Sequence, residues 1–230
     1  MSGHFKVFGP VNLAILAAIP ATAGALAMLA RHRHGSARAL RLLFGGLLAA
    51  NELFWYWYNI HQRWFSFPGN LPLNLCHLTL WLTVAALLTL HPWSYEMAYF
   101  IGIAGSSMAM LTPDLWGAFP SYPTTYFFLA HAGTIAGALY LSWAKLAQPR
   151  PRGVWRAFGA LNAYAAAVAV FDLIFQTNYA YLCQKPQAAS LLNYFGPWPI
   201  YILVGDAFAL SCFLLLWLPF RRSKLPAIAS

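Results

Sequence analysis

Long apolar runs separated by short polar or basic stretches recur along the whole chain. A helix needs about 20 apolar residues to cross the hydrocarbon core of a bilayer. Seven runs approach that length, and we expect membrane-spanning helices at residues 10–30, 38–60, 72–91, 95–113, 124–144, 156–175 and 198–220. The pattern therefore predicts an all-α, polytopic membrane protein in which residues 1–230 form a single seven-transmembrane-helix bundle.

The connections between these runs differ strongly in length. The turn at His91-Pro92-Trp93 is very short, which predicts that the third and fourth spans form a tight antiparallel hairpin. Two connections are long, at residues 114–123 and 176–197. Because these connections follow the fourth and the sixth span, an even number of crossings separates each from the N-terminus, and we expect both on the same side as the N-terminus.

Composition excludes an ordinary soluble domain, because 60% of the residues are hydrophobic and only 8% are charged, against about 25% charged residues in soluble proteins. A net charge of +9 would suggest nucleic acid in a soluble protein, but here the basic residues form short clusters between apolar runs. Such clusters are topology signals. We therefore expect membrane lipids as partners and no nucleic acid, and the sequence leaves the oligomeric state open.

Basic residues also predict the orientation. Of the 14 Lys and Arg residues, all but Lys6, Arg63 and Lys185 follow the first, fifth or seventh span and so fall on one side. The positive-inside rule then places the N-terminus outside and the C-terminus in the cytoplasm. We therefore expect a multi-pass protein of the cell inner (plasma) membrane. A cleaved signal peptide is the alternative for the first span, but its length and the basic residues after it favour a permanent helix.

The sequence has only five acidic residues, and Glu52, Asp172 and Asp206 fall inside predicted spans. An ionised carboxylate there costs at least about 2.5 kcal/mol, so we expect these groups to have a function. Counting about 1.5 Å per residue from the outer ends of their helices places all three in the outer half of the membrane. This placement predicts a polar cavity that opens outward or sideways into the outer leaflet.

The second predicted span carries a polar stripe. Glu52, Tyr56, Asn59 and Arg63 recur at the spacing of one helical face, which we expect to point into the bundle. A structural alternative also exists, in which Glu52 and Asp206 form buried pairs with Arg63, with His61 or with each other.

Cys76 and His131 are the best candidates for catalytic residues, because the same residue count places both in the outer half of their spans. A cysteine needs an imidazole partner to act as a nucleophile at neutral pH. The alternatives are a hydrogen-bonded core role for His131 and a disulfide between Cys76 and Cys183. His77 lies about 100° from Cys76 on the helix, on a stripe shared with Asn74.

Several short motifs resemble one family. They are Leu71-Pro72-Leu73-Asn74-Leu75-Cys76, Asn51-Glu52, His131, Asn178-Tyr179, Lys185-Pro186 and Gly196-Pro197-Trp198-Pro199. Their order and spacing resemble the YwaF-like bacterial integral membrane family, whose animal relatives include the transmembrane protein 164 family. The likeness covers most of the chain.

The resemblance implies acyl transfer on lipids through an acyl-enzyme, with Cys76 as the nucleophile and His131 as its proton acceptor. This sequence departs from the family at Asn74, where histidine often precedes the cysteine by two residues. The expected substrate-binding residues are Glu52, Asn59, Asn74, His77, Asp172, Asn178, Lys185 and Asp206. Lys185 or Arg63 could hold a phospholipid phosphate at the headgroup level; no metal or cofactor is expected.

Other functions remain open at this point. A transporter, channel or small-molecule binder would use Glu52, Asp172 and Asp206 to relay protons or to hold a cation. A purely structural role would leave these carboxylates unexplained. A retinal photoreceptor is excluded, because the last span has no lysine between Trp198 and Phe220.

Overall fold

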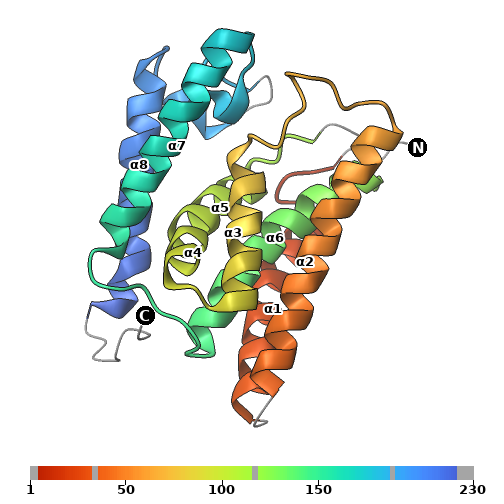
Figure 1. Cartoon of the computed structure of the whole chain (residues 1–230), viewed down its shortest axis with the longest axis vertical. Coiled ribbons are helices and arrows are strands. Elements are labelled where there is room, and N and C mark those ends of the chain that lie inside the picture. Colours follow the sequence, from red (N-terminus) through yellow and green to blue (C-terminus); the bar gives the residue numbers. More distant parts are fainter. Residues whose placement is uncertain (1–4, 33–35, 116–118, 187–189, 222–230) are drawn as a thin grey trace.

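The computed structural model describes residues 5–32, 36–115, 119–186 and 190–221, and within them the chain is all-helical without strands (Figure 1). The α-helices and the π turn η1 are, in chain order, α1 (Pro10–His32), α2 (Ser36–His61), α3 (Leu75–Thr89), α4 (Pro92–Met97), η1 (Ala98–Gly102), α5 (Ile103–Leu111), α6 (Tyr122–Trp143), α7 (Gly153–Phe175) and α8 (Ile200–Trp217). Short 3-10 turns follow at η2 (Tyr179–Tyr181), η3 (Leu191–Tyr194) and η4 (Leu218–Phe220). Each of the seven predicted spans corresponds to a helical segment.

The fourth predicted span is one continuous helix made of α4, η1 and α5. Its junction residues Met97, Ala98, Gly102 and Ile103 all have right-handed helical φ and ψ angles, and η1 is a π turn. A π turn widens the helix locally. The α4–η1–α5 helix therefore changes the direction in which its side chains point halfway along its length.

Predicted and observed boundaries differ by up to three residues, and prolines explain the larger differences. The third span begins at Leu75 instead of residue 72, because Asn74 has an extended backbone with φ −72° and ψ 143° after Pro72. The fourth begins at Pro92 instead of residue 95, because proline is favoured in the first helical turn. Leu90 is left-handed at φ 58° and forms the predicted tight hairpin between α3 and α4.

With α4–η1–α5 taken as one helix, successive helices run in opposite directions, so that their ends gather at two poles (Figure 1). One pole holds the described N-terminal residues, the α2–α3 connection and the long connection between α7 and α8. The other holds the α3–α4 hairpin, the connection from α6 to α7 and the end of α8. We call the first pole the loop pole and the second the hairpin pole.

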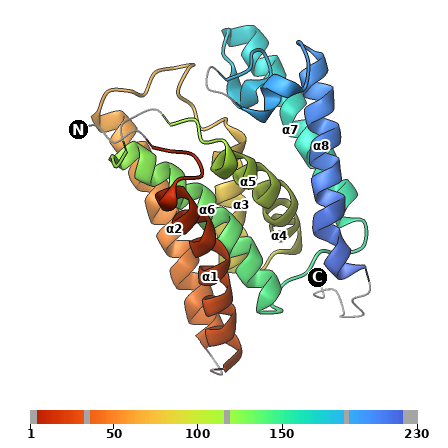
Figure 2. The same ribbon diagram turned by 180° about the vertical axis from the view of Figure 1, so that it is seen from behind.

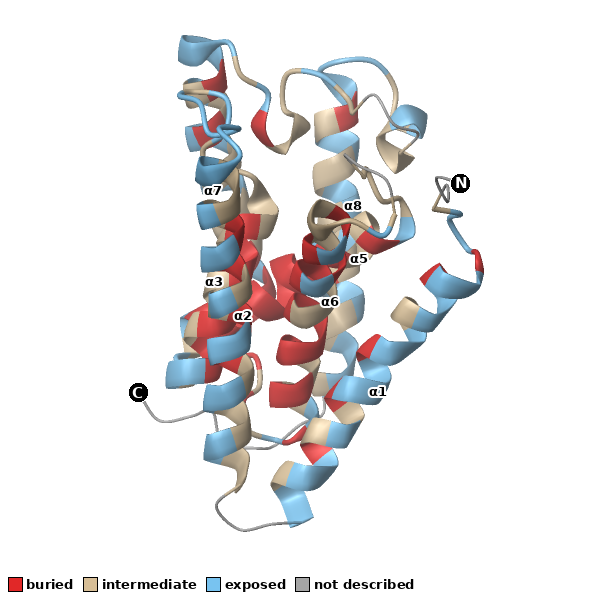
Figure 3. Cartoon of the chain, turned by 90° about the vertical axis from the view of Figure 1, so that its right-hand side faces the viewer, coloured by how far each residue is buried: buried red, intermediate tan, exposed pale blue. Residues whose placement is uncertain are grey.

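Burial concentrates on α3, η1 and α6, whereas α1, α7 and α8 are largely exposed (Figure 3). Helix α6 packs against α1, α2, α3 and α5. Gly137 allows its close approach to α3, because a Cβ there would lie 2.8 Å from Thr83 Cγ2. Small residues of this kind let helices pack tightly in lipid, where no hydrophobic effect drives them together.

Three helical segments of the described chain are long and apolar enough to cross a membrane: Pro10–His32, Gly153–Phe175 and Ile200–Phe220. Within their most apolar windows only 17%, 11% and 11% of residues are buried, as expected of helices that face lipid. The other predicted spans are not both long and apolar enough, because they are shorter, are interrupted by η1 or are more polar. These are the helices of a membrane protein, although fewer are clearly apolar than the seven predicted.

Helices α7 and α8 form a pair that stands beside the remaining helices (Figures 1 and 2). At the hairpin pole this pair is attached through Glu96 of α4, whose carboxylate is fully buried. Glu96 accepts bonds from Arg150 and Arg156 at 2.6–3.1 Å. Glu96 lies at the start of the fourth predicted span, and the sequence pattern did not predict this structural role.

Candidate functional site

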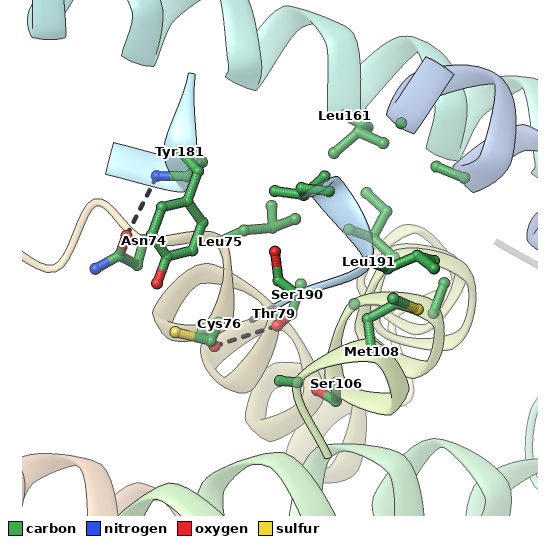
Figure 4. A pocket seen from close by; sticks show the side chains of 18 of the residues that line it. Asn74, Leu75, Cys76, Thr79, Ser106, Met108, Leu161, Tyr181, Ser190 and Leu191 are labelled. Atoms are coloured by element: carbon green, nitrogen blue, oxygen red, sulfur yellow. Dashed lines mark hydrogen bonds between the residues drawn. The ribbon is translucent and has the colours of Figure 1, made fainter. Parts of the chain in front are cut away.

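A cavity of about 520 Å³ lies between the α7–α8 pair and the central helices. Its walls are mostly apolar, with residues such as Leu161, Leu191 and Met108 projecting into it (Figure 4). Pockets of this size hold small molecules or parts of larger ones. The polar residues in the wall include Asn74, Cys76, His77, Thr79, Tyr126, His131, Tyr164, Tyr181 and Asp206.

Cys76 lies in the first turn of α3, directly after the extended Asn74. Its carbonyl accepts a hydrogen bond from Thr79 Oγ1 at 3.1 Å, which Figure 4 shows below Asn74 and Tyr181. Cys76, Cys183 and Cys212 are all free thiols. The disulfide weighed between Cys76 and Cys183 is therefore not formed in this structure, and Cys76 forms part of the cavity wall as a free cysteine.

His131 reaches the same cavity from α6. Its Nδ1 lies 2.7 Å from the carbonyl oxygen of Phe127, and its ring packs on the Phe127 ring at 4.3 Å between centroids. Because a carbonyl only accepts, Nδ1 carries the proton and Nε2 is the acceptor. Among the described residues no hydrogen bond joins His131 to Cys76, so the fold brings the two to one cavity from different helices without bonding them to each other.

Glu52 has a fully buried side chain and bridges α3 and α6. Its Oε1 lies 2.6 Å from His77 Nδ1, and its Oε2 accepts from the Tyr126 hydroxyl, also at 2.6 Å. The pairing of Glu52 with Arg63 or His61, which the sequence left as an alternative, is not formed among the described residues. Both of those residues are exposed, and Arg63 lies beyond the end of α2 with φ 58°.

The polar stripe of α2 is only half directed inward. Glu52 is buried, and the half-buried Tyr56 accepts a hydrogen bond from Trp81 at 3.0 Å. Asn59 instead donates to the carbonyl of Trp55 in its own helix at 2.8 Å, and it does not reach the cavity. The stripe fails beyond Asn59 because α2 ends at residue 61, before Arg63.

Asp172 organises the end of α7 rather than the cavity wall. Its Oδ1 accepts from the Thr177 hydroxyl at 2.6 Å and from the backbone N–H of Tyr179 at 3.0 Å. The chain reverses here through the left-handed Gln176. A buried carboxylate at this point therefore satisfies backbone and hydroxyl donors of the connection that follows.

The η2 turn is held over the cavity from several directions. The Tyr179 hydroxyl donates to the Pro68 carbonyl at 2.6 Å and accepts from the Leu71 N–H at 2.7 Å. Asn74 Oδ1 accepts from the N–H of Ala180 at 3.3 Å. Ala180 and Tyr181 are both left-handed, at φ 52° and 56°. Non-glycine residues adopt this conformation at a cost of about 1–2 kcal/mol each, so the surrounding bonds maintain it.

Tyr181 lies at the loop-pole end of the cavity, beside Cys76 and Asn74 in Figure 4. Its hydroxyl donates to Asp114 Oδ2 at 3.1 Å, and its carbonyl accepts from the Tyr201 hydroxyl at 2.6 Å. Burial and the neighbouring Asp114 carboxylate raise the pKa of the Tyr181 phenol. Tyr181 therefore remains a protonated hydrogen-bond donor at the cavity.

The remaining predicted site residues divide into two groups. Asp206 lines the cavity and accepts from Asn162 Nδ2 at 3.0 Å. Asn178 instead closes its own connection, accepting from the N–H of Cys183 and of Gln184 at 3.0 and 2.9 Å. Lys185 lies 5.3 Å above the ring of Tyr201, a cation–π contact outside the cavity wall. Within the described residues no cluster of metal-ligand type is present.

Comparison with known proteins gives one match. The model of the TMEM164 family matches residues 7–217, a range that includes the first six predicted spans, most of the seventh and every cavity residue named above. No curated protein matches the chain, and no solved structure matches it.

Proposed function

The chain belongs to the TMEM164 family, and from that premise we propose that it is a membrane-embedded enzyme transferring acyl groups of membrane lipids through Cys76 and His131. Transfer to water would make it a lipid hydrolase, and transfer to a lysolipid an acyltransferase. The observation that carries the proposal is that a thiol and an imidazole from two helices line one largely apolar cavity. Such a cavity suits an acyl chain.

We also propose seven crossings with the loop pole outside and the hairpin pole in the cytoplasm. The support is the alternation of the helices together with the basic residues around Arg31, Arg41, Arg150 and Arg221, which belong to the hairpin pole. This orientation puts Cys76 in the outer half of the inner (plasma) membrane. Because α7 and α8 expose apolar side chains, a phospholipid would enter the cavity from the outer leaflet.

The chemistry has two half-reactions. In the first, His131 Nε2 takes the Cys76 proton, the sulfur attacks the ester carbonyl and the C–O bond breaks, and the departing lysolipid oxygen takes the proton from His131. The Asn74 amide or the Tyr181 phenol would donate to the oxyanion. Catalytic hydrogen bonds are often long before substrate binds, so we expect the Cys76 sulfur and His131 to approach each other only in the complex.

The test uses the purified protein in vesicles that contain a phospholipid with a labelled acyl chain. We expect the label on Cys76 as a thioester that hydroxylamine cleaves, detected by peptide mass spectrometry. Cys76→Ala should abolish the label, and His131→Ala should lower its rate of formation by about 100-fold or more. Cys183→Ala and Cys212→Ala are matched controls that should keep it. A label that survives in Cys76→Ala would refute the proposal.

A transporter or ion-binding role has less support. Within the described residues only Asp206 of the three carboxylates considered for it lines the cavity. Glu52 is bonded to His77 and Tyr126, and Asp172 is bonded to Thr177 and Tyr179. Because each carboxylate has separate partners, the arrangement does not favour a proton relay between them.

A further inference from the structure

A second imidazole lines the cavity besides His131. His77 follows Cys76 directly in the first turns of α3, and only 9% of its surface is exposed. Adjacent helical residues point about 100° apart, so His77 borders the cavity beside Cys76 without being directed at its sulfur. The proposed acylation step, with His131 as proton acceptor, makes no use of this second ring.

The orientation of His77 is set from outside the cavity by a buried carboxylate. Glu52 is 0% exposed and lies 2.6 Å from His77 Nδ1. Tyr126 donates to the other carboxylate oxygen at 2.6 Å and stacks on Trp55 at 4.2 Å between centroids, with the rings 7° from parallel. The carboxylate is therefore itself held on both oxygens, by two other helices.

This arrangement is the one that orients a general base. A carboxylate bonded to Nδ1 holds the imidazole in the tautomer whose Nε2 accepts a proton, and it stabilises the imidazolium that forms. Among the described residues no protein atom is bonded to His77 Nε2, which leaves this nitrogen for a ligand. An imidazole in such a position is suited to take a proton from a hydroxyl group that enters the cavity next to Cys76.

We propose that His77, oriented by Glu52, is the general base of the second half-reaction and activates the hydroxyl group that receives the acyl chain. The inference rests on the proposed function. His77 Nε2 takes the acceptor O–H proton while the oxygen attacks the thioester carbonyl of acyl-Cys76. The new C–O bond forms, the C–S bond breaks, and the Cys76 thiolate leaves. The proton on His77 then returns to the thiolate through solvent or His131.

The acceptor hydroxyl belongs either to a lysophospholipid or to water. Both have the chemistry that His77 would activate, and they differ in product. Glu52 and Tyr126 act only through His77 and are positioning residues. The competing explanation is a structural one, in which the Glu52 pair merely joins α2, α3 and α6. That role would lower both half-reactions together, or stability alone.

The experiment measures the two half-reactions separately in vesicles. Rapid mixing with a labelled phospholipid follows formation of acyl-Cys76, and transfer of the acylated protein into unlabelled vesicles follows its discharge, with and without added lysophospholipid. We expect His77→Gln to form acyl-Cys76 within about threefold of the wild-type rate and to discharge it about 100-fold more slowly. Discharge only with lysophospholipid would identify an acyltransferase, and discharge without it a hydrolase.

Variants of the positioning residues Glu52 and Tyr126 test the inference even if His77→Gln does not fold. Glu52→Gln should slow discharge at least tenfold and should shift its pH profile, because the ring loses its anionic partner. Tyr126→Phe, which removes only one hydroxyl, should slow discharge by a smaller factor. Tyr164→Phe is the matched control, because its hydroxyl also lines the cavity but donates instead to the Leu73 carbonyl at 2.8 Å.

Opposite outcomes are separable. If wild-type protein forms no acyl-Cys76, the proposed function fails and this inference falls with it. If acyl-Cys76 forms and His77→Gln discharges it at the wild-type rate, only this inference fails. Equal slowing of acylation and discharge in His77→Gln and Tyr126→Phe, or equal effects of Tyr126→Phe and Tyr164→Phe, would establish the structural explanation instead.

Discussion

Replacing Glu96 by glutamine should loosen the attachment of α7 and α8 to the rest of the protein. The Glu96 carboxylate is fully buried and accepts five hydrogen bonds, three from Arg150 and two from Arg156. Glutamine has nearly the same shape, but it has one acceptor oxygen and no charge. The variant therefore removes the ion pairs while it leaves the packing around residue 96 almost unchanged.

The magnitude follows from burial. Breaking a buried ion pair costs about 3–5 kcal/mol. Here the side chains of Arg150 and Arg156 are 33% and 35% exposed, so solvent screens the ion pairs. We therefore expect a loss of about 2–3 kcal/mol in the free energy of unfolding. For a chain of this size each kcal/mol shifts Tm by about 2–4 °C. Glu96→Gln should therefore lower Tm in detergent micelles by roughly 5–10 °C, measured by tryptophan fluorescence.

Arg152→Gln is the matched control for Glu96→Gln. Arg152 is exposed in the same connection, so this change also removes one charge near the hairpin pole without breaking a bond to Glu96. Its Tm should stay within about 1 °C of the wild type, as is usual for exposed positions. A Glu96→Gln protein that unfolds at the same temperature as Arg152→Gln would refute the conclusion that this cluster attaches the α7–α8 pair.

Two further changes test the packing and the loop pole. Gly137→Val should destabilise the protein by about 1–3 kcal/mol, because its side chain would collide with Thr83, whereas Gly46→Ala, with open space around it, should keep or raise Tm. Tyr179→Phe should cost about 1–2 kcal/mol, because it leaves the Pro68 carbonyl and the Leu71 N–H without their partner. Hydrogen exchange should then rise in residues 176–186 and stay unchanged in α1; uniform exchange throughout would contradict the role given to Tyr179.

Much of the helical architecture was predictable, because a helix that meets lipid must satisfy its backbone internally and carry apolar side chains. All seven predicted spans correspond to helices, and the hairpin at Leu90 follows from the shortness of the turn. The family resemblance was confirmed by the match over residues 7–217. The π turn was not predictable, because its residues Ala98–Gly102 read as ordinary apolar helix.

The candidate site was predictable in part. Cys76, His131, Asn74, His77 and Asp206 line one cavity. A shared depth in the membrane suggested this for Cys76, His131 and Asp206, but Glu52 and Asp172, assigned to the same half of the membrane, do not line the cavity. The partners of the buried carboxylates were not predictable, because burial requires a donor without specifying which one. Tyr126 gave no signal among 12 tyrosines, although a carboxylate inside a span implied that some neighbouring helix must supply such a group.

The sequence alone determined which segments are helical and that lipid surrounds many of them, because these properties depend on apolar length and on local backbone chemistry. Only the tertiary structure decided which side chains meet. Glu52 is bonded to His77 and Tyr126 because α2, α3 and α6 pack together at that level. Glu96 holds two arginines because the α6–α7 connection folds back onto α4. Such contacts depend on the rotation and register of each helix, which hydropathy does not encode.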